Sequence, residues 1–506
     1  MAINFIPNDP LAVTALPMRM KTARRSRSRT VAGFTLAPSG PQARYAPGTP
    51  DFLFWQTREA ALAAVQVFED LQGRRVARWA RSADPRFLDL IPNAGVDLNA
   101  YYDGQSLSFF EYTTRGVTTY SGASTDVVAH EVGHALLDTI RPDLWDTTFP
   151  ETNAFHEAFG DCMAILTALA DESTRRVVLA SIRTANPVEA TAEELSAAVR
   201  RLLGAQHPAS TPRRARNTFQ WALPSALPSV GPPSVLTSEV HSFARVFIGC
   251  FWDTLLGVFA RQRTASATAL WAATRTAGRL LIAAAAQAPE TARFFQSVGQ
   301  AMVLVDEQTN GSANRTVIRE AFAGHNVMLG SNAMLAPSAA LAGKAPKIGA
   351  PGRAAGVSPS VLQDLRRRIN APAGSRMTMS SRTVAGQPVA HLVHHRRVSL
   401  GGLDARLRGV VAVAREPVLV GATGATQSRA AVLGTLPEAH TSTDEVRTYV
   451  STLLESGRIA FDAEGARKGL GGVRTKDQRE RPAMFAVRGR GGERVLTRLR
   501  FACRED

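Results

Sequence analysis

The spacing of apolar positions divides the chain into stretches of different character. Up to about residue 50 the sequence is rich in Pro, Arg, Ser and Thr without sustained periodicity, so we expect a poorly ordered basic arm over residues 1–50. From Phe52 apolar residues recur at helical spacing, with Thr57 as the expected helix cap. Residues 96–112 alternate between apolar and polar positions around Asp103 and Gly104, a pattern that predicts a strand hairpin.

Long helical patterns dominate the rest of the first 330 residues. Pro-rich and polar stretches separate them, and they cover residues 125–140, 154–170, 238–260, 266–287 and 290–308. A strand-rich half followed by a helical half is typical of an α+β protein. We therefore predict an α+β domain over residues 51–330.

A change of composition marks the end of that domain. Residues 331–375 are rich in Ala, Pro, Gly and Ser, which predicts a linker. Ordered patterns then return, with short strand-like stretches at 391–393, 409–414 and 418–420, a helical stretch at 444–455 and a hairpin at 484–501 that turns at residues 488–492. These patterns predict a small α+β accessory domain over residues 376–506, whose role the sequence does not indicate.

Composition narrows the kinds of site that the chain can carry. The 506 residues are 45% hydrophobic, enough for more than one buried core. Cys162, Cys250 and Cys503 are far apart and form no C-x-x-C pair, which argues against a disulfide framework and against a thiolate zinc site. Any metal must then be held by His and carboxylate side chains.

The formal net charge of +16 permits binding to nucleic acid or anionic surfaces. The basic residues are mostly scattered Arg, however, and no helix-turn-helix, RNP or zinc-finger pattern accompanies them. We therefore expect no nucleic-acid partner.

The sequence shows no targeting or membrane segment. The first ten residues lack the basic and apolar regions of a secretory signal, and the longest apolar run, residues 280–286, is shorter than a membrane span requires. We expect no membrane span and a cytoplasmic location, while export by another route and the oligomeric state stay open.

The strongest chemical signal is an H-E-x-x-H motif. On a helix, His130 and His134 lie four residues apart, so that both imidazoles face the same side and can grip one zinc ion. Glu131 lies beside them, where it can take a proton from water as a general base. Apolar residues flank the motif on both sides and predict a buried site.

A catalytic zinc requires a third protein ligand and an open position. Downstream of the motif the candidates are Glu151 and Glu157, with His156 as a rival. Glu157 is favoured because Asp161 follows one helical turn later and can accept a hydrogen bond from the distal nitrogen of a zinc-bound His.

These residues resemble the thermolysin family of zinc metallopeptidases, the gluzincins, whose third ligand is a Glu in an N-E-x-x-x-D helix. Here that helix reads His-Glu-Ala-Phe-Gly-Asp over residues 156–161, with His156 in place of the family's Asn. The resemblance covers residues 52–330 and implies a two-lobed fold with a strand-rich N-lobe and a helical C-lobe. It also implies one catalytic zinc held by His130, His134 and Glu157.

Two further segments are similar to the family. Residues 99–104 resemble its substrate-binding edge strand, which implies that Asn99 and the Ala100 backbone hold the peptide. Residues 240–242 resemble its V-H-x-N-S segment, which implies that His241 stabilises the oxyanion, although Phe243 and Ala244 replace the Asn and Ser.

Two other family features are altered in this chain. Trp145 stands where the family has a Tyr donor, and its indole N–H can donate a hydrogen bond but cannot accept one. Asp126 matches one calcium-ligand position but Ala168 occupies another, which makes a complete calcium site doubtful.

The sequence therefore predicts a zinc-dependent endopeptidase that hydrolyses peptide or protein substrates. One alternative is a catalytically weakened peptide-binding module on the same fold, which the changes at Trp145 and around His241 favour. Another is a basic nucleic-acid or surface-binding protein with a structural metal, although structural zinc sites usually have four ligands and are rich in thiolates.

Overall fold

The structure is a computed structural model. It describes residues 2–182, 184–329, 363, 366–367, 375–384, 387–422, 430–432, 439–461, 483–490 and 493–502. Most of the predicted linker at 331–375 lies outside the described residues, and so does Cys503.

The helices of the first 330 residues follow the predicted pattern closely. The five long ones expected there are confirmed, as α2 (Thr125–Ile140), α3 (Pro150–Leu169), α6 (Val240–Ala260), α7 (Ala267–Gln287) and α8 (Phe294–Asn310). Further helices are α1 (Pro50–Gln72), α4 (Glu172–Ala180), α5 (Glu193–Leu203), α9 (Arg315–Gly324) and, near the C-terminus, α12 (Ala439–Glu455).

The predicted cap of the first long helix is wrong by two turns. Helix α1 begins at Pro50, and the Thr49 side chain accepts a hydrogen bond from the Phe52 amide. A Thr followed by Pro is a strong helix start, because the proline φ angle already suits the first turn. Thr57 lies inside the helix, fully buried, and its hydroxyl donates to the Gly122 carbonyl oxygen at 2.8 Å.

A five-stranded sheet lies beside these helices in the order β18-β5-β6-β4-β3. Its strands are β3 (Gly33–Thr35), β4 (Phe87–Ile91), β5 (Ala100–Tyr102), β6 (Ser106–Phe109) and β18 (Phe501–Ala502). Strands β5 and β6 form the hairpin expected around Asp103 and Gly104. Gly104 has a φ of +88°, which glycine adopts without strain. A second hairpin joins β7 (Glu111–Thr114) and β8 (Val117–Tyr120).

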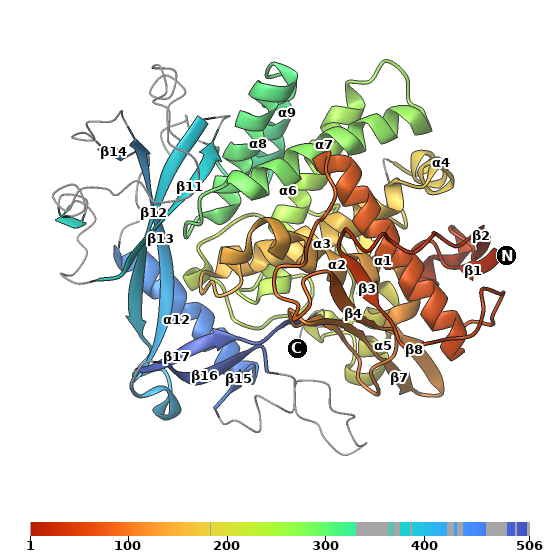
Figure 1. Cartoon of the computed structure of the whole chain (residues 1–506), viewed down its shortest axis with the longest axis horizontal. Helices are drawn as coiled ribbons and strands as arrows, with labels where there is room; N and C mark the ends of the chain where they lie inside the picture. The colour runs from red at the N-terminus through yellow and green to blue at the C-terminus, as the bar shows by residue number, and fades with distance from the viewer. Residues whose placement is uncertain are drawn as a thin grey trace.

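The C-terminal part forms a sheet of its own in the order β11-β12-β13-β17-β16-β15, with β14 paired to β13. Its strands are β11 (Met377–Val384), β12 (Gln387–Ser399), β13 (Val410–Ala422), β14 (Ala430–Val432), β15 (Ile459–Ala460), β16 (Phe485–Arg490) and β17 (Glu493–Arg498). In Figure 1 this sheet lies at the left of the view and the N-terminal strands at the right, with the helices between them. The described parts of the chain are thus an α+β fold, as predicted.

The N-terminal residues are not a poorly ordered arm. Strands β1 (Ala2–Phe5) and β2 (Arg19–Thr22) pair with each other, and Ile3 and Phe5 are buried. The basic side chains are held by buried carboxylates of α1, since Lys21 pairs with Glu59 at 2.7 Å and Arg27 pairs with Glu69 at 2.5 Å. The missing periodicity reflects short strands whose partners are distant in sequence. Two further short strands, β9 (Ala190–Thr191) and β10 (Arg213–Arg214), pair near the site described below.

The C-terminal part packs directly against the helical part. Arg498 donates to the Trp145 carbonyl oxygen at 2.9 Å, Arg293 of the loop before α8 pairs with Glu445 of α12 at 2.5 Å, and one hydrophobic cluster includes residues of both parts. After β17 the chain crosses back to the first sheet, where β18 pairs with β5.

Helix α6 is the one helix of the described residues that is long and apolar enough to cross a membrane by length and composition. Of its most apolar window, 78% is buried inside the molecule, where it contributes to the core. A core helix passes the same test of length and composition.

Candidate metal centre

Close packing of α2 against α3 builds the centre, and glycine permits it. A methyl group on Gly133 would lie 2.9 Å from the Gly160 Cα atom, and one on Gly160 would lie 2.6 Å from His130 Nδ1. Neither position has room for a side chain, so the helices approach at these two glycines. This approach brings the His residues of α2 against the carboxylates of α3.

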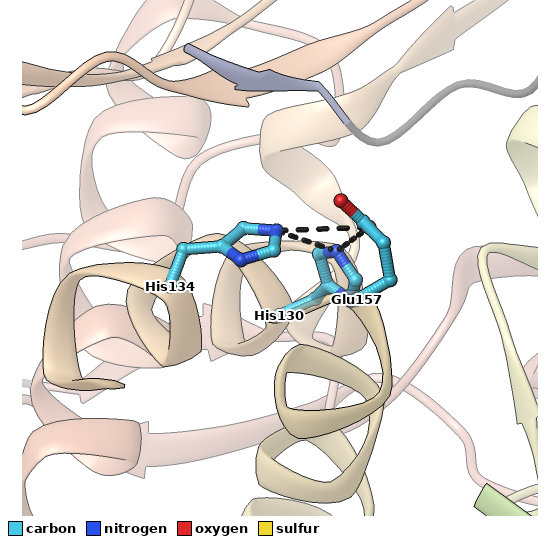
Figure 2. Close-up of side chains that lie close together, drawn as sticks. All are labelled: His130, His134 and Glu157. Atoms are coloured by element: carbon cyan, nitrogen blue, oxygen red, sulfur yellow. Dashed lines mark hydrogen bonds and ion pairs between the residues drawn. The ribbon is translucent and has the colours of Figure 1, made fainter. Parts of the chain in front are cut away.

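Three side chains converge between these helices. The Glu157 Oε2 atom lies 3.3 Å from His130 Nε2 and 3.7 Å from His134 Nε2, and the two nitrogens are 3.1 Å apart. Figure 2 shows both imidazoles pointing at the Glu157 carboxylate. All three side chains are fully buried. Potential ligand atoms of the three lie within 4.8 Å of one another.

This arrangement suits a metal ion. Two imidazole nitrogens 3.1 Å apart require a proton or a cation between them, because two lone pairs repel. Three imidazole nitrogens surround Glu157 Oε2 at 3.2–3.7 Å, whereas the buried Oε1 atom has no hydrogen-bond partner among the described residues, which is costly. Two nitrogens and one carboxylate oxygen are a ligand set that zinc accepts, with a fourth position left for water or substrate.

The two His residues differ in protonation. Burial lowers the pKa of His134 to about 3 despite the nearby Glu157 charge. Burial acts in the same direction at His130, but the charge and hydrogen bond of Asp161 outweigh it and raise that pKa to about 9. Metal binding and protonation therefore compete for the His130 nitrogen.

Asp161 holds His130 in the orientation that a metal ligand needs. His130 Nδ1 donates to Asp161 Oδ1 at 2.7 Å, which leaves Nε2 facing Glu157. Arg213 of β10 donates to both Asp161 oxygens at 2.8 Å. Burial alone raises the pKa of Asp161, but the Arg213 charge outweighs it and lowers the pKa to about 2. Sequence reasoning missed Arg213, because nothing in the sequence separates it from the many other Arg residues.

Glu131 is fully buried, and neither of its carboxylate oxygens has a hydrogen-bond partner among the described residues. Burial, together with the charge of Glu157, raises its pKa to about 8, although the charge of His130 opposes the shift. A cation held by the neighbouring side chains would oppose this shift and favour the carboxylate form that a general base requires.

His241 joins the cluster from the first turn of α6. Its Nε2 atom lies 3.2 Å from Glu157 Oε2 and donates to the Ala502 carbonyl oxygen at 2.7 Å. Its Nδ1 atom donates to Glu239 Oε1 at 2.8 Å, and Glu239 also caps α6. Burial lowers the pKa of His241, but the charges of Glu157 and Glu239 outweigh it and hold the pKa well above its usual value. Glu239 was also missed, although an acidic residue just before a helix is a recognisable cap signal.

The two rival third ligands lie differently from Glu157. Glu151 accepts hydrogen bonds from Trp221 Nε1 at 2.9 Å and from the Phe295 amide at 3.0 Å, which directs its carboxylate away from the His pair. His156 is fully buried and stacks on Phe501, with ring centroids 4.1 Å apart. The group of side chains close enough to share an ion contains neither of them.

The predicted substrate-binding residues are engaged by their own chain. Asn99 is buried and its side-chain oxygen accepts a hydrogen bond from the Ala100 amide at 2.9 Å. Ala100 begins β5 and pairs with Phe109 of β6. The other edge of β5 pairs with β18.

Trp145 lies on the same side of the centre. Its ring meets Phe501 edge-on, with centroids 5.4 Å apart, and the Arg81 guanidinium lies 4.6 Å from its centroid. At the predicted calcium position, Asp126 accepts from the Val127 and Ala192 amides, and Ala168 is a buried core residue.

No model of a known protein family matches this chain. A search of the curated proteins finds no match either. The geometry and chemistry of the described residues therefore carry the functional argument.

Proposed function

We propose that this chain is a zinc-dependent endopeptidase with the two-lobed fold of the thermolysin family. The observation that carries the proposal is the convergence of His130, His134 and Glu157, fully buried, on one point between α2 and α3. Bound there, a zinc ion would polarise a peptide carbonyl and lower the pKa of water.

The remaining residues have complementary tasks in this proposal. Glu131 takes a proton from the attacking water and passes it to the leaving amine. His241 donates a hydrogen bond from Nε2 to the oxygen that becomes negative in the tetrahedral intermediate. Asp161 keeps the His130 ring in place through the 2.7 Å bond to Nδ1.

The test combines metal content with peptide cleavage. We expect about one zinc per wild-type chain by elemental mass spectrometry. Glu157→Ala should lose the metal, and Glu131→Gln should keep it while cleavage of a casein-derived peptide disappears. Chelators should abolish wild-type cleavage.

A matched control is Glu290→Gln, which replaces another buried carboxyl whose pKa burial raises to about 7. It lies outside the metal group, so both zinc and cleavage should survive. Cleavage that persists in Glu131→Gln would refute the mechanism.

The second candidate is a peptide-binding module without turnover. The pairing of β18 with β5 favours it, because a peptide segment already lies against the edge of the sheet beside the centre. Zinc without cleavage in any variant, combined with peptide binding, would support this alternative.

A further inference from the structure

Residues of this chain's own C-terminal part occupy the edge of β5. Phe501 pairs with Tyr102 and Ala502 pairs with Tyr101, in antiparallel register. Addition of an extended segment to a sheet edge is a standard mode of peptide recognition. The strand that would bind substrate in the proposed function is therefore already paired.

The carbonyl group of Ala502 lies at the centre itself. Its oxygen accepts the 2.7 Å hydrogen bond from His241 Nε2, and the same nitrogen lies 3.2 Å from Glu157 Oε2. This is where the proposed mechanism places the carbonyl oxygen of a substrate.

The Phe501 side chain covers His134 and its neighbour His156. Its ring stacks on His134 with centroids 4.8 Å apart and on His156 with centroids 4.1 Å apart. The Arg498 guanidinium lies 4.0 Å from the ring centroid, and Phe501 is only 1% exposed.

We propose that residues 498–502 are an intramolecular peptide ligand that fills the substrate position and keeps the metal centre closed. The inference rests on the proposed function for the meaning of that position. The side chains of His134, His156 and Trp145 then accept an aromatic side chain, which comes from the residue preceding the one whose carbonyl oxygen His241 binds. Substrates in trans compete with this segment for the edge of β5.

The test compares two full-length variants. Phe501→Ala removes the ring from the centre. Phe52→Ala in α1 is the matched control, because it removes an equally buried ring from a separate small cluster with Ile6, Leu53 and Ala123. Three quantities are measured: cleavage of a casein-derived peptide, the rate of zinc removal by phenanthroline, and binding of a labelled Arg-Leu-Arg-Phe-Ala peptide by fluorescence anisotropy.

We expect all three quantities to increase in Phe501→Ala by between about tenfold and a hundredfold. Loss of one buried Phe side chain should shift the equilibrium between the closed and the open centre by this factor. Phe52→Ala should match the wild type in all three. A peptide with Ala in place of Phe should bind the opened variant more weakly than Arg-Leu-Arg-Phe-Ala by a similar factor.

The outcomes separate this inference from the proposed function. Faster zinc removal and tighter peptide binding without cleavage in any variant would support the closed centre and refute the peptidase. Unchanged zinc removal and peptide binding in Phe501→Ala would overturn the inference, even if the wild type cleaves peptides. If Phe501→Ala fails to fold, Ala502→Pro takes its place, because proline disrupts the pairing with β5 without removing the ring. The same three measurements on that variant then test the inference.

Discussion

A methyl group added at Gly160 should disturb the centre without changing any of its functional groups. In Gly160→Ala the new Cβ atom would lie 2.6 Å from His130 Nδ1 and 2.8 Å from Cε1. Ordinary contact needs about 3.5 Å, so the ring or the helix must move by about 0.9 Å. The ring is not free to move, because Asp161 holds its Nδ1 atom at 2.7 Å.

The expected cost has two opposing parts. Overpacking of this kind destabilises by about 1–3 kcal/mol, while replacing Gly by Ala in a helix stabilises by about 1 kcal/mol. Gly324→Ala in α9 is the matched control, since a methyl group there meets nothing within 4 Å. The difference in unfolding free energy between the two variants should therefore be about 1–3 kcal/mol.

Metal affinity should respond more clearly than stability. Ligand distances at a metal site tolerate only about 0.2 Å, so the displaced His130 should weaken zinc binding by about tenfold or more. The assays are urea unfolding followed by circular dichroism and zinc competition with a chromophoric chelator. Equal stability of the two variants with unchanged zinc affinity would refute the packing argument.

Two further predictions concern buried charges. Asp161→Asn should weaken zinc binding by about 10- to 100-fold in the same competition assay, because His130 loses a charged acceptor and Arg213 loses its counter-ion. Unchanged zinc affinity would exclude the role of Asp161 in positioning His130. Burial raises the pKa of Glu69, but hydrogen bonds from Arg27 and the Val76 amide outweigh it and lower the pKa below its usual value. This carboxylate therefore stabilises the fold at pH values above its unfolded pKa of about 4.3. The stability that Glu69→Gln loses at pH 7, measured by urea unfolding, should shrink as the pH falls below about 4. A difference in unfolding free energy between the two proteins that does not change with pH would contradict this prediction.

The helices and the convergence of His130, His134 and Glu157 could be predicted from sequence because their signals are local. An i, i+4 His pair and a Glu with an Asp one turn later define faces of helices, and α2 and α3 present them as expected. The strand hairpin around Gly104 was likewise set by neighbouring residues.

The parts that escaped prediction depend on distant partners. Strands β1 and β2 are four residues each, and the salt bridges from Arg27 and Lys21 to α1 that hold the segment leave no periodic pattern. Arg213 reaches Asp161 from a two-residue strand. The role of β18 was also invisible, since Phe501 and Ala502 carry no pattern that identifies β5 as their partner.

The pairing of β18 with β5 also has a consequence for biosynthesis. Tyr102 leaves the ribosome roughly 400 residues before its partner Phe501, which at typical rates is about 20–80 s of translation. Helices α2 and α3 and the His241 segment emerge well within that interval, so the ligands can assemble while the edge of β5 is still unpaired. We expect the centre of each new molecule to be open during this interval. Nascent or neighbouring chains can then pair with the edge of β5.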